Sequence, residues 1–268
     1  MRRAVTNATV FLGGGRITSA LVSGLRLASY KPPIVVHDRH REKSLALKKH
    51  YGVMAEPDLQ RAVAAADLLV IAVRPDSVRE LLTAIAPVDR PVTIVSLAAG
   101  IPLSHLQKHL GRPAHWVRAM PSPTCRAGNG LTALAFPART PSRVRKQATR
   151  LFELVGSVVE IPEKNFDAFT VTYSVSHGYH ALATLARAAE RIGLDPKTAL
   201  MAASHALAEG ILSWREGDAS LDELLHEAAT PGGIAAAVTK AMQDSGHPRI
   251  VERALRAGLA RAKANARR

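Results

Sequence analysis

The sequence is poor in cysteine, in aromatic residues and in long hydrophobic runs, and each shortage excludes a class of protein. The lone cysteine, Cys125, excludes an internal disulfide and fits a reducing cytoplasm. No window of about 18 uninterrupted apolar residues occurs, so we expect neither a membrane span nor a membrane partner. The first seven residues contain no apolar signal core. These absences predict a cytoplasmic globular protein.

Aromatic residues make up only 4% of the chain, whereas alanine is abundant and the net charge is +14. Small apolar side chains favour closely packed helices. The positive charge raises nucleic acid as a partner, but the basic residues are spread along the whole chain and no basic run is flanked by aromatic residues. We therefore expect no nucleic-acid partner and a basic surface that attracts anionic cofactors and substrates. A nucleic-acid-associated protein stays open as an alternative, which a salt-dependent gel shift would test.

An apolar run of strand length, residues 9–12, ends at three consecutive glycines, and a helical pattern begins directly after them. This strand, turn and helix predict the opening of a dinucleotide-binding unit. Gly13 permits the tight turn, and Gly15 removes a side chain where a pyrophosphate approaches the N-terminus of the helix. Thr18 stands where glycine or alanine normally permits close packing of helix and strand. A glycine-rich turn of another α/β fold is the alternative.

Strand-like and helical stretches alternate through residues 1–162, which predicts a Rossmann domain: an α/β fold with a doubly wound parallel sheet. We expect right-handed parallel crossovers and a ligand crevice at the carboxyl ends of the strands. The expected strands after the first cover residues 34–38, 67–73, 92–97, 116–120, 131–136 and 158–161. The expected helices after the first cover residues 42–51, 58–65, 77–85, 103–110 and 143–154.

After Pro162 no strand-like run follows, so we predict a second, all-helical domain over residues 163–268. One long helix is expected from Asn165 to Ile192, with further helices after it. This long helix is apolar most of the way round, and such a helix must be buried. Because the helices alone cover little surface, we expect a second copy of the chain to cover it, in a homodimer or a higher assembly.

Five segments in order resemble the pyrroline-5-carboxylate reductase family. They are residues 11–25 (FLGGGRITSALVSGL), Ala72-Val73-Arg74-Pro75, residues 96–101 (SLAAGI), Arg118-Ala119-Met120-Pro121 followed by Gly128-Asn129-Gly130, and Thr230-Pro231-Gly232-Gly233. The resemblance implies a Rossmann domain, a helical dimerisation domain, NADPH or NADH as hydride donor, and reduction of a cyclic imine to proline. The candidate cofactor contacts are Gly13, Gly15, Arg16, Ile17, Asp38, Arg39, Ala72, Val73, Arg74, Pro75, Ala98, Met120 and Pro121.

The chain departs from this family in the substrate site. The family's Asn-Thr-Pro is here residues 122–124 (SPT), its Ser-Gly-Ser-Gly-Pro-Ala-Tyr segment is residues 173–179 (YSVSHGY), and its threonine associated with the imine nitrogen is Ala235. Three interpretations stay open. The chain reduces pyrroline-5-carboxylate, it reduces a different imine, or it is a non-catalytic NADP(H)-binding regulator.

A carboxylate of the substrate needs hydrogen-bond donors, and an imine nitrogen needs a proton. Thr230 is a good helix N-cap and Pro231 a good first helical residue, so the backbone N–H groups beyond them suit a carboxylate. An ordinary capped helix is the alternative. The candidate substrate contacts are Thr230, Gly232, Gly233, Ile234 and Ala235.

The candidate proton donors are Tyr173 and His177, which we expect on one face of the long helix together with His180. His177 is favoured because histidine titrates nearest neutrality, and packed or partner-facing polar side chains are the alternative. His105 and His109 are interpreted as a solvated helix face, so no metal is predicted.

The choice between cofactors depends on the end of the second expected strand. Asp38 there favours a ribose diol and NAD(H), whereas Arg39 can hold the 2′-phosphate of NADP(H). The family resemblance favours NADP(H), and NAD(H) stays open. Cys125 is expected to be a buried thiol without a catalytic part.

Overall fold

The computed structural model describes residues 6–111 and 113–267. Packing divides the chain into two compact units, one that runs to Tyr173 and resumes at Ala257, and one that spans Ser174–Arg256. The first compact unit therefore extends past residue 162, where the sequence predicts the start of the helical domain. The reason is that Phe166 is buried against Ala133, within the first unit.

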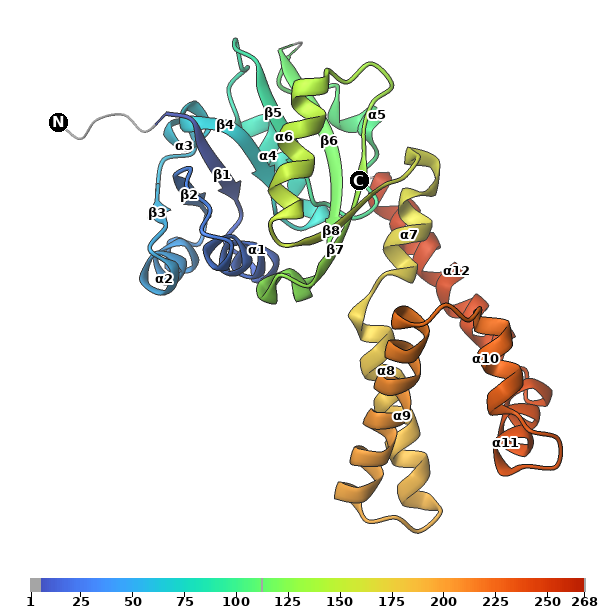
Figure 1. Cartoon of the computed structure of the whole chain (residues 1–268). Coiled ribbons are helices and arrows are strands. Elements are labelled where there is room, and N and C mark those ends of the chain that lie inside the picture. The colour runs from blue at the N-terminus through green and yellow to red at the C-terminus, as the bar shows by residue number, and fades with distance from the viewer. Residues whose placement is uncertain (1–5, 112, 268) are drawn as a thin grey trace. The chain divides into compact units, whose positions relative to one another are not determined.

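The first unit is built on one eight-stranded sheet with the order β3-β2-β1-β4-β5-β6-β7-β8 (Figure 1). The strands are β1 (Ala8–Leu12), β2 (Ile34–His37), β3 (Met54–Ala55), β4 (Ala66–Ile71), β5 (Val92–Ser96), β6 (Ala114–Pro121), β7 (Gly130–Ala135) and β8 (Gly156–Glu160). The chain builds outward from β1 in one direction and from β4 in the other. This change of direction creates the switch point at which doubly wound sheets bind ligands.

Six strands, β1 to β6, are parallel, as predicted, but β7 is antiparallel to β6. The expectation of parallel crossovers is wrong at this step because only η2 (Pro123–Ala127), a short 3-10 turn, connects β6 to β7. A parallel return needs a crossover of a dozen or more residues. The start of β7 consequently lies beside the carboxyl end of β6, at the same edge as the predicted crevice.

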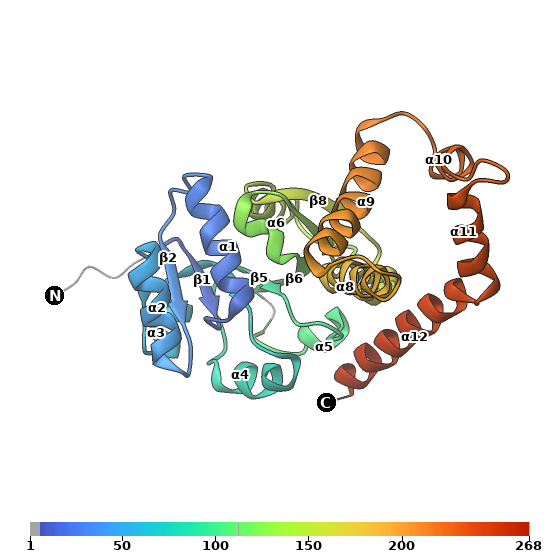
Figure 2. The same cartoon turned by 90° about the horizontal axis from the view of Figure 1, so that it is seen from below.

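Helices cover both faces of the sheet, with α1 and α6 on one side and α4 and α5 on the other (Figure 2). Neighbouring strand residues therefore enter different cores: Ile94 of β5 packs with the α4 side, and Val95 packs with the α1 side. The helices are α1 (Arg16–Leu27), α2 (Arg41–Tyr51), α3 (Leu59–Ala65), α4 (Val78–Ala84, after the short η1, Pro75–Ser77), α5 (Leu103–Leu106) and α6 (Ser142–Glu153).

Between β8 and residue 267, the last one that the structure describes, no further strand follows, but the expected long helix is corrected. The expected helix of residues 165–192 is two helices, because Tyr173 leaves helical geometry and the Ser174 side chain caps the next helix by accepting from the Ser176 N–H. The helices, after the short η3 (Glu163–Asn165), are α7 (Phe166–Thr172), α8 (Val175–Arg191), α9 (Pro196–Glu216), α10 (Leu221–Ala228), α11 (Ile234–Asp244) and α12 (His247–Ala266). Among the described helices, none is long and apolar enough to cross a membrane.

Close packing of α1 on the turn after β6 generates a stability prediction. A methyl group added at Gly24 would overlap the Cys125 carbonyl oxygen and stand 2.9 Å from Val155. We expect Gly24→Ala to lower the free energy of unfolding by about 1–3 kcal/mol, measured by urea denaturation at fixed protein concentration. The matched control is Gly210→Ala in α9, where the added methyl meets nothing within 4 Å. Equal stability of Gly24→Ala and wild type would contradict this packing.

Candidate functional site

The glycine turn after β1 has the geometry that the sequence predicts. Gly13 has φ +110°, and a side chain there would stand 2.6 Å from the Ala72 carbonyl oxygen, so only glycine fits. Gly15 is the extended N-cap residue of α1, and nothing lies within 4 Å of a side chain added to it. The turn thus leaves its backbone open in front of the helix N-terminus, with Arg16 and Ile17 in the first helical turn.

Thr18 explains why the third small residue of the turn can be replaced. Its side chain is fully buried, and its hydroxyl donates a hydrogen bond of 2.6 Å to the Gly13 carbonyl oxygen. The hydroxyl satisfies a backbone acceptor that the tight turn removes from the strand ladder. Thr18 therefore fixes the turn and does not disrupt it.

Two charged residues directly follow β2: Asp38, which is hydrogen-bonded to the backbone, and Arg39, which is exposed. The Asp38 carboxylate accepts hydrogen bonds from the N–H groups of Gly14, at 2.7 Å, and of His40, at 2.8 Å. Arg39 is 65% exposed and lies 3.4 Å from Glu80. Asp38 thus binds the backbone of the glycine turn, whereas the Arg39 side chain is largely exposed to solvent and faces Glu80.

The other candidate cofactor residues follow neighbouring strands at one edge of the sheet. The Ala72 N–H donates to Leu12 at 2.8 Å, so the end of β4 continues pairing with the end of β1. Ala98 follows β5 and is buried, and Met120 near the end of β6 is half-buried. Of the remaining candidates, Val73 and Pro75 are half-buried, Arg74 is exposed and Pro121 is buried. The sheet therefore brings the glycine turn and these segments to its carboxyl edge.

Tyr173 reaches the same edge. Its hydroxyl oxygen accepts a hydrogen bond of 2.9 Å from the N–H of Leu131, at the start of β7. A tyrosine hydroxyl that accepts one hydrogen bond still has its own proton to donate. His177 lies exposed on α8, in the other compact unit. The expectation that Tyr173 shares a helix face with His177 and His180 is wrong because the helix is interrupted between them.

The turn before α11 differs from its prediction. The N-cap of α11 is Gly233 and its first residue is Ile234, so Thr230 is not the N-cap. Gly232 has φ +79°, outside helical geometry, and the Gly233 N–H donates to the Thr230 carbonyl oxygen at 2.9 Å. The helix therefore begins later than the Thr-Pro pair indicates. The N–H groups of Ile234 and Ala235 still belong to its first turn, and Ile234 is 87% exposed.

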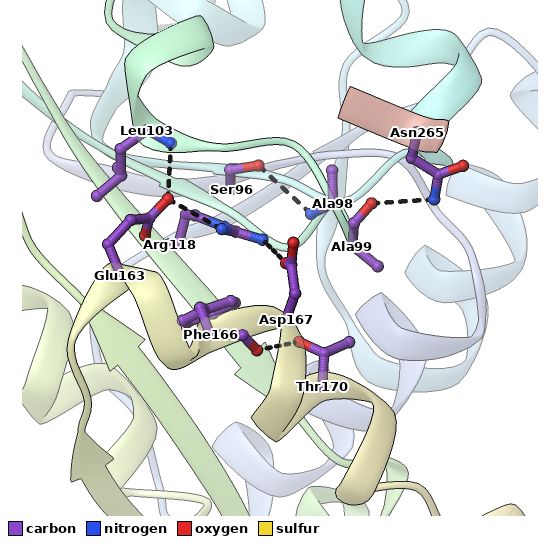
Figure 3. Close-up of polar contacts among 10 residues, drawn as sticks. All are labelled: Ser96, Ala98, Ala99, Leu103, Arg118, Glu163, Phe166, Asp167, Thr170 and Asn265. Carbon is purple, nitrogen blue, oxygen red and sulfur yellow. Dashed lines mark hydrogen bonds and ion pairs between the residues drawn. The ribbon is translucent and has the colours of Figure 1, made fainter. Parts of the chain in front are cut away.

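Arg118 is a site residue that the sequence interpretation missed. It lies in β6 with 2% exposure, and it binds Glu163 at 2.9 Å and Asp167 at 2.8 Å (Figure 3). Its guanidinium also stands 4.2 Å from the centre of the Phe166 ring. The Glu163 Oε1 atom that binds it accepts a second hydrogen bond, of 3.0 Å, from the Leu103 N–H. The available signal was a charged residue inside the apolar run of the sixth strand.

The two histidines of the fifth helical stretch do not share a helix face, because α5 ends at Leu106. His105 and His109 line a cavity of about 250 Å³ together with Arg79 and Lys108. Across residues 6–111 and 113–267, no group of three or more histidine, cysteine, aspartate or glutamate side chains could hold a metal ion.

Cys125 is buried, as expected. It is fully buried beside α1, and this burial raises the pKa of the thiol to about 11. Only roughly one thiol in a thousand is then ionised at a pH near 8, and the thiolate is the nucleophile. We expect a thiol-specific reagent to leave the native protein unmodified at that pH and to label it fully in urea. Rapid stoichiometric labelling of native protein would contradict this environment.

Comparison with known proteins matches both parts of the chain. Residues 9–100 match the family model "NADP oxidoreductase coenzyme F420-dependent", and residues 163–265 match "Pyrroline-5-carboxylate reductase dimerisation". The pyrroline-5-carboxylate reductase of Corynebacterium melassecola is 28% identical over 242 residues, which cover 88% of this chain and 90% of that protein.

Two solved structures show the same fold. A pyrroline-5-carboxylate reductase from Coxiella burnetii has a TM-score of 0.85 at 24% identity, over 97% of this chain and 99% of that one. The Plasmodium falciparum enzyme, solved with NADP bound, has a TM-score of 0.81 at 20% identity, over 98% and 99%. The chain is thus similar to pyrroline-5-carboxylate reductases over most of its length, and its C-terminal segment matches their dimerisation model.

Proposed function

We propose that this protein reduces pyrroline-5-carboxylate, using NAD(P)H as hydride donor. The observation that carries the proposal is the open glycine turn at the carboxyl end of β1, set at the same sheet edge as the segments after β4, β5 and β6. The full-length relatives named as pyrroline-5-carboxylate reductases support it. The different-imine and regulator interpretations are not favoured.

The described residues fit a dinucleotide. Gly15, Arg16 and Ile17 would hold the pyrophosphate at the start of α1, because that N-terminus offers bare N–H groups and a positive dipole end. The segment 72–75, Ala98 and residues 120–121 would line the nicotinamide side of the crevice. When bound, the nicotinamide supplies the hydride.

The chain's own residues must hold the carboxylate and deliver a proton. We assign the carboxylate to the N–H groups of the first turn of α11, at Ile234 and Ala235, preceded by the turn of residues 230–233. Ala235 has no hydroxyl, so the proton must come from another group. Tyr173 is the better-placed donor, because its hydroxyl is held at the sheet edge with its proton available. His177, on α8, is the second candidate.

The function is tested by NADPH consumption with a panel of cyclic imines, with and without a carboxylate. The account predicts turnover with pyrroline-5-carboxylate and slower turnover without the carboxylate. Binding of NADPH without turnover of any imine would favour the regulator interpretation instead.

The donor assignment predicts that Tyr173→Phe lowers the turnover rate at least about tenfold while NADPH binding stays intact. His177→Ala is the competing variant, and Ala235→Thr should restore part of the rate if only that donor is missing. Steady-state kinetics and NADPH titration measure both properties. If neither Tyr173→Phe nor His177→Ala slows turnover, the proton comes from water or another residue.

The choice between cofactors predicts a selective loss at Arg39. Since a guanidinium makes charge-assisted hydrogen bonds to phosphate, Arg39→Ala should weaken NADPH binding about tenfold and leave NADH binding unchanged. Arg143→Ala, an exposed arginine of α6, is the matched control. Unchanged NADPH affinity in Arg39→Ala would overturn the assignment of the 2′-phosphate to this residue.

We also propose that the protein works as a homodimer in the cytoplasm, through the helices of Ser174–Arg256. In the single chain this unit exposes large apolar side chains, among them Leu185 at 42% and Ile192 at 86%. Monomeric proteins rarely expose extensive apolar patches. A second copy would remove this surface from water, consistent with the dimerisation segment matched over residues 163–265.

The dimer proposal predicts that Leu185→Arg abolishes self-association, because a charge buried in an apolar contact without a partner is costly. Leu27→Arg is the matched control, at a leucine of α1 that is 68% exposed in the other unit. Sedimentation velocity at micromolar concentration measures the outcome. A wild type that sediments as a stable monomer, or an unaffected dimer in Leu185→Arg, would contradict it.

A further inference from the structure

The loop after β5, residues 97–102, is held by contacts with distant segments of the chain. The Ser96 hydroxyl accepts a hydrogen bond of 3.3 Å from the Ala98 N–H, which curls the start of the loop. At the other end of the loop, the Leu103 N–H donates to Glu163, whose carboxylate is itself fixed by the buried Arg118. The loop is therefore closed on one side by the first residue of the helical segment.

The last turn of α12 holds the middle of the same loop. The Asn265 side-chain amide donates a hydrogen bond of 3.2 Å to the Ala99 carbonyl oxygen, as Figure 3 shows. Gly100 has φ +79°, and a side chain there would overlap the backbone of Ala262, itself buried. Helix and loop thus meet backbone to backbone, at a glycine in a conformation that other residues rarely adopt.

We propose that Asn265 is a positioning residue for the cofactor, acting through the shape of the Ala98–Gly100 turn. Ala98 lies at the carboxyl edge where the proposed function places the nicotinamide, and the inference rests on that placement. A single side-chain amide fixes the carbonyl direction at Ala99, and with it the path of the backbone next to Ala98. No other hydrogen bond between a side chain and residues 99–102 occurs among the described residues.

The position of Asn265 gives this contact a second consequence. The segment matched to the dimerisation family runs from residue 163 to residue 265. Both of its end residues, Glu163 and Asn265, form hydrogen bonds with the loop after β5 or its flanking residue Leu103. Most of the segment between those ends, Ser174–Arg256, forms the other compact unit. The loop after β5 is therefore held by the two parts of this segment that belong to the first unit, one before Ser174 and one after Arg256.

The test is NADPH binding to the full chain, measured by calorimetry, together with the KM for NADPH and kcat. Asn265→Ala should raise the NADPH dissociation constant and KM about three- to tenfold, the effect of one lost hydrogen bond, with kcat changed less. Asn265→Asp should weaken binding further, because a carboxylate would face the Ala99 carbonyl oxygen without a donor. Asn265→Gln, which keeps the amide, should recover part of the affinity. Lys263→Ala, an exposed residue of the same helix, is the control.

Thermal unfolding without cofactor separates positioning from stability. We expect equal melting temperatures for wild type, Asn265→Ala and Lys263→Ala, and a smaller NADPH-induced rise only in Asn265→Ala. If Asn265→Ala binds NADPH with wild-type affinity, the inference is overturned but the proposed function stands. The same holds if Lys263→Ala loses as much NADPH affinity as Asn265→Ala. Failure of the wild type to bind NADPH would instead refute the proposed function.

Discussion

The buried guanidinium of Arg118 is the interaction on which the arrangement of the site depends. A charge taken out of water is costly unless it is paired, and removing one partner of such a pair is more costly than never having built it. Arg118 lies in the middle of β6, and both of its carboxylate partners come from residues 163–167. The sheet can bury β6 only if the start of the helical segment docks on it.

Docking of that segment accounts for two features of the carboxyl edge. Helix α7 ends at Thr172, and the hydroxyl of the next residue, Tyr173, accepts from the N–H of Leu131 beside the end of β6. Glu163 uses one oxygen atom for both Arg118 and the Leu103 N–H, so the loop after β5 is fixed by the same ion pair. One buried charge thus orders a candidate proton donor and a cofactor loop at once.

Features set by local chemistry were predictable from the sequence. The turn at Gly13 needs a residue that accepts φ +110°, and the strands of the parallel sheet are apolar runs because both faces are covered. The Asp195 cap of α9 is likewise a local feature, because its side chain accepts from the N–H groups of Lys197 and Thr198 two and three residues later. At each of these positions, the residue type and its sequence neighbours are enough to predict the local structure.

Features set by distant contacts were not predictable. The residues around Arg118 in the sequence do not indicate that Glu163 is its partner. The residues around Asn265 likewise do not indicate Ala99, which is 166 positions away. The break at Tyr173 was hidden because an apolar, helix-like pattern continues through it, whereas the short connection of η2 reversed β7 against the parallel pattern. The prediction of an N-cap at Thr230 was wrong because the two glycines after Pro231 form a turn before the helix begins. The sequence therefore predicted which segments gather at the carboxyl edge of the sheet but not the distant contacts that hold them there.

The central claim is that the cofactor binds along the carboxyl edge of the sheet, at the glycine turn and the loops after β4 and β5. Amide hydrogen exchange of the whole protein, with and without NADPH, tests it most directly. The account predicts slower exchange on NADPH addition in residues 13–19, 72–75 and 96–103, with little change in α6. Protection confined to other segments, or no protection in the glycine turn at saturating NADPH, would contradict it.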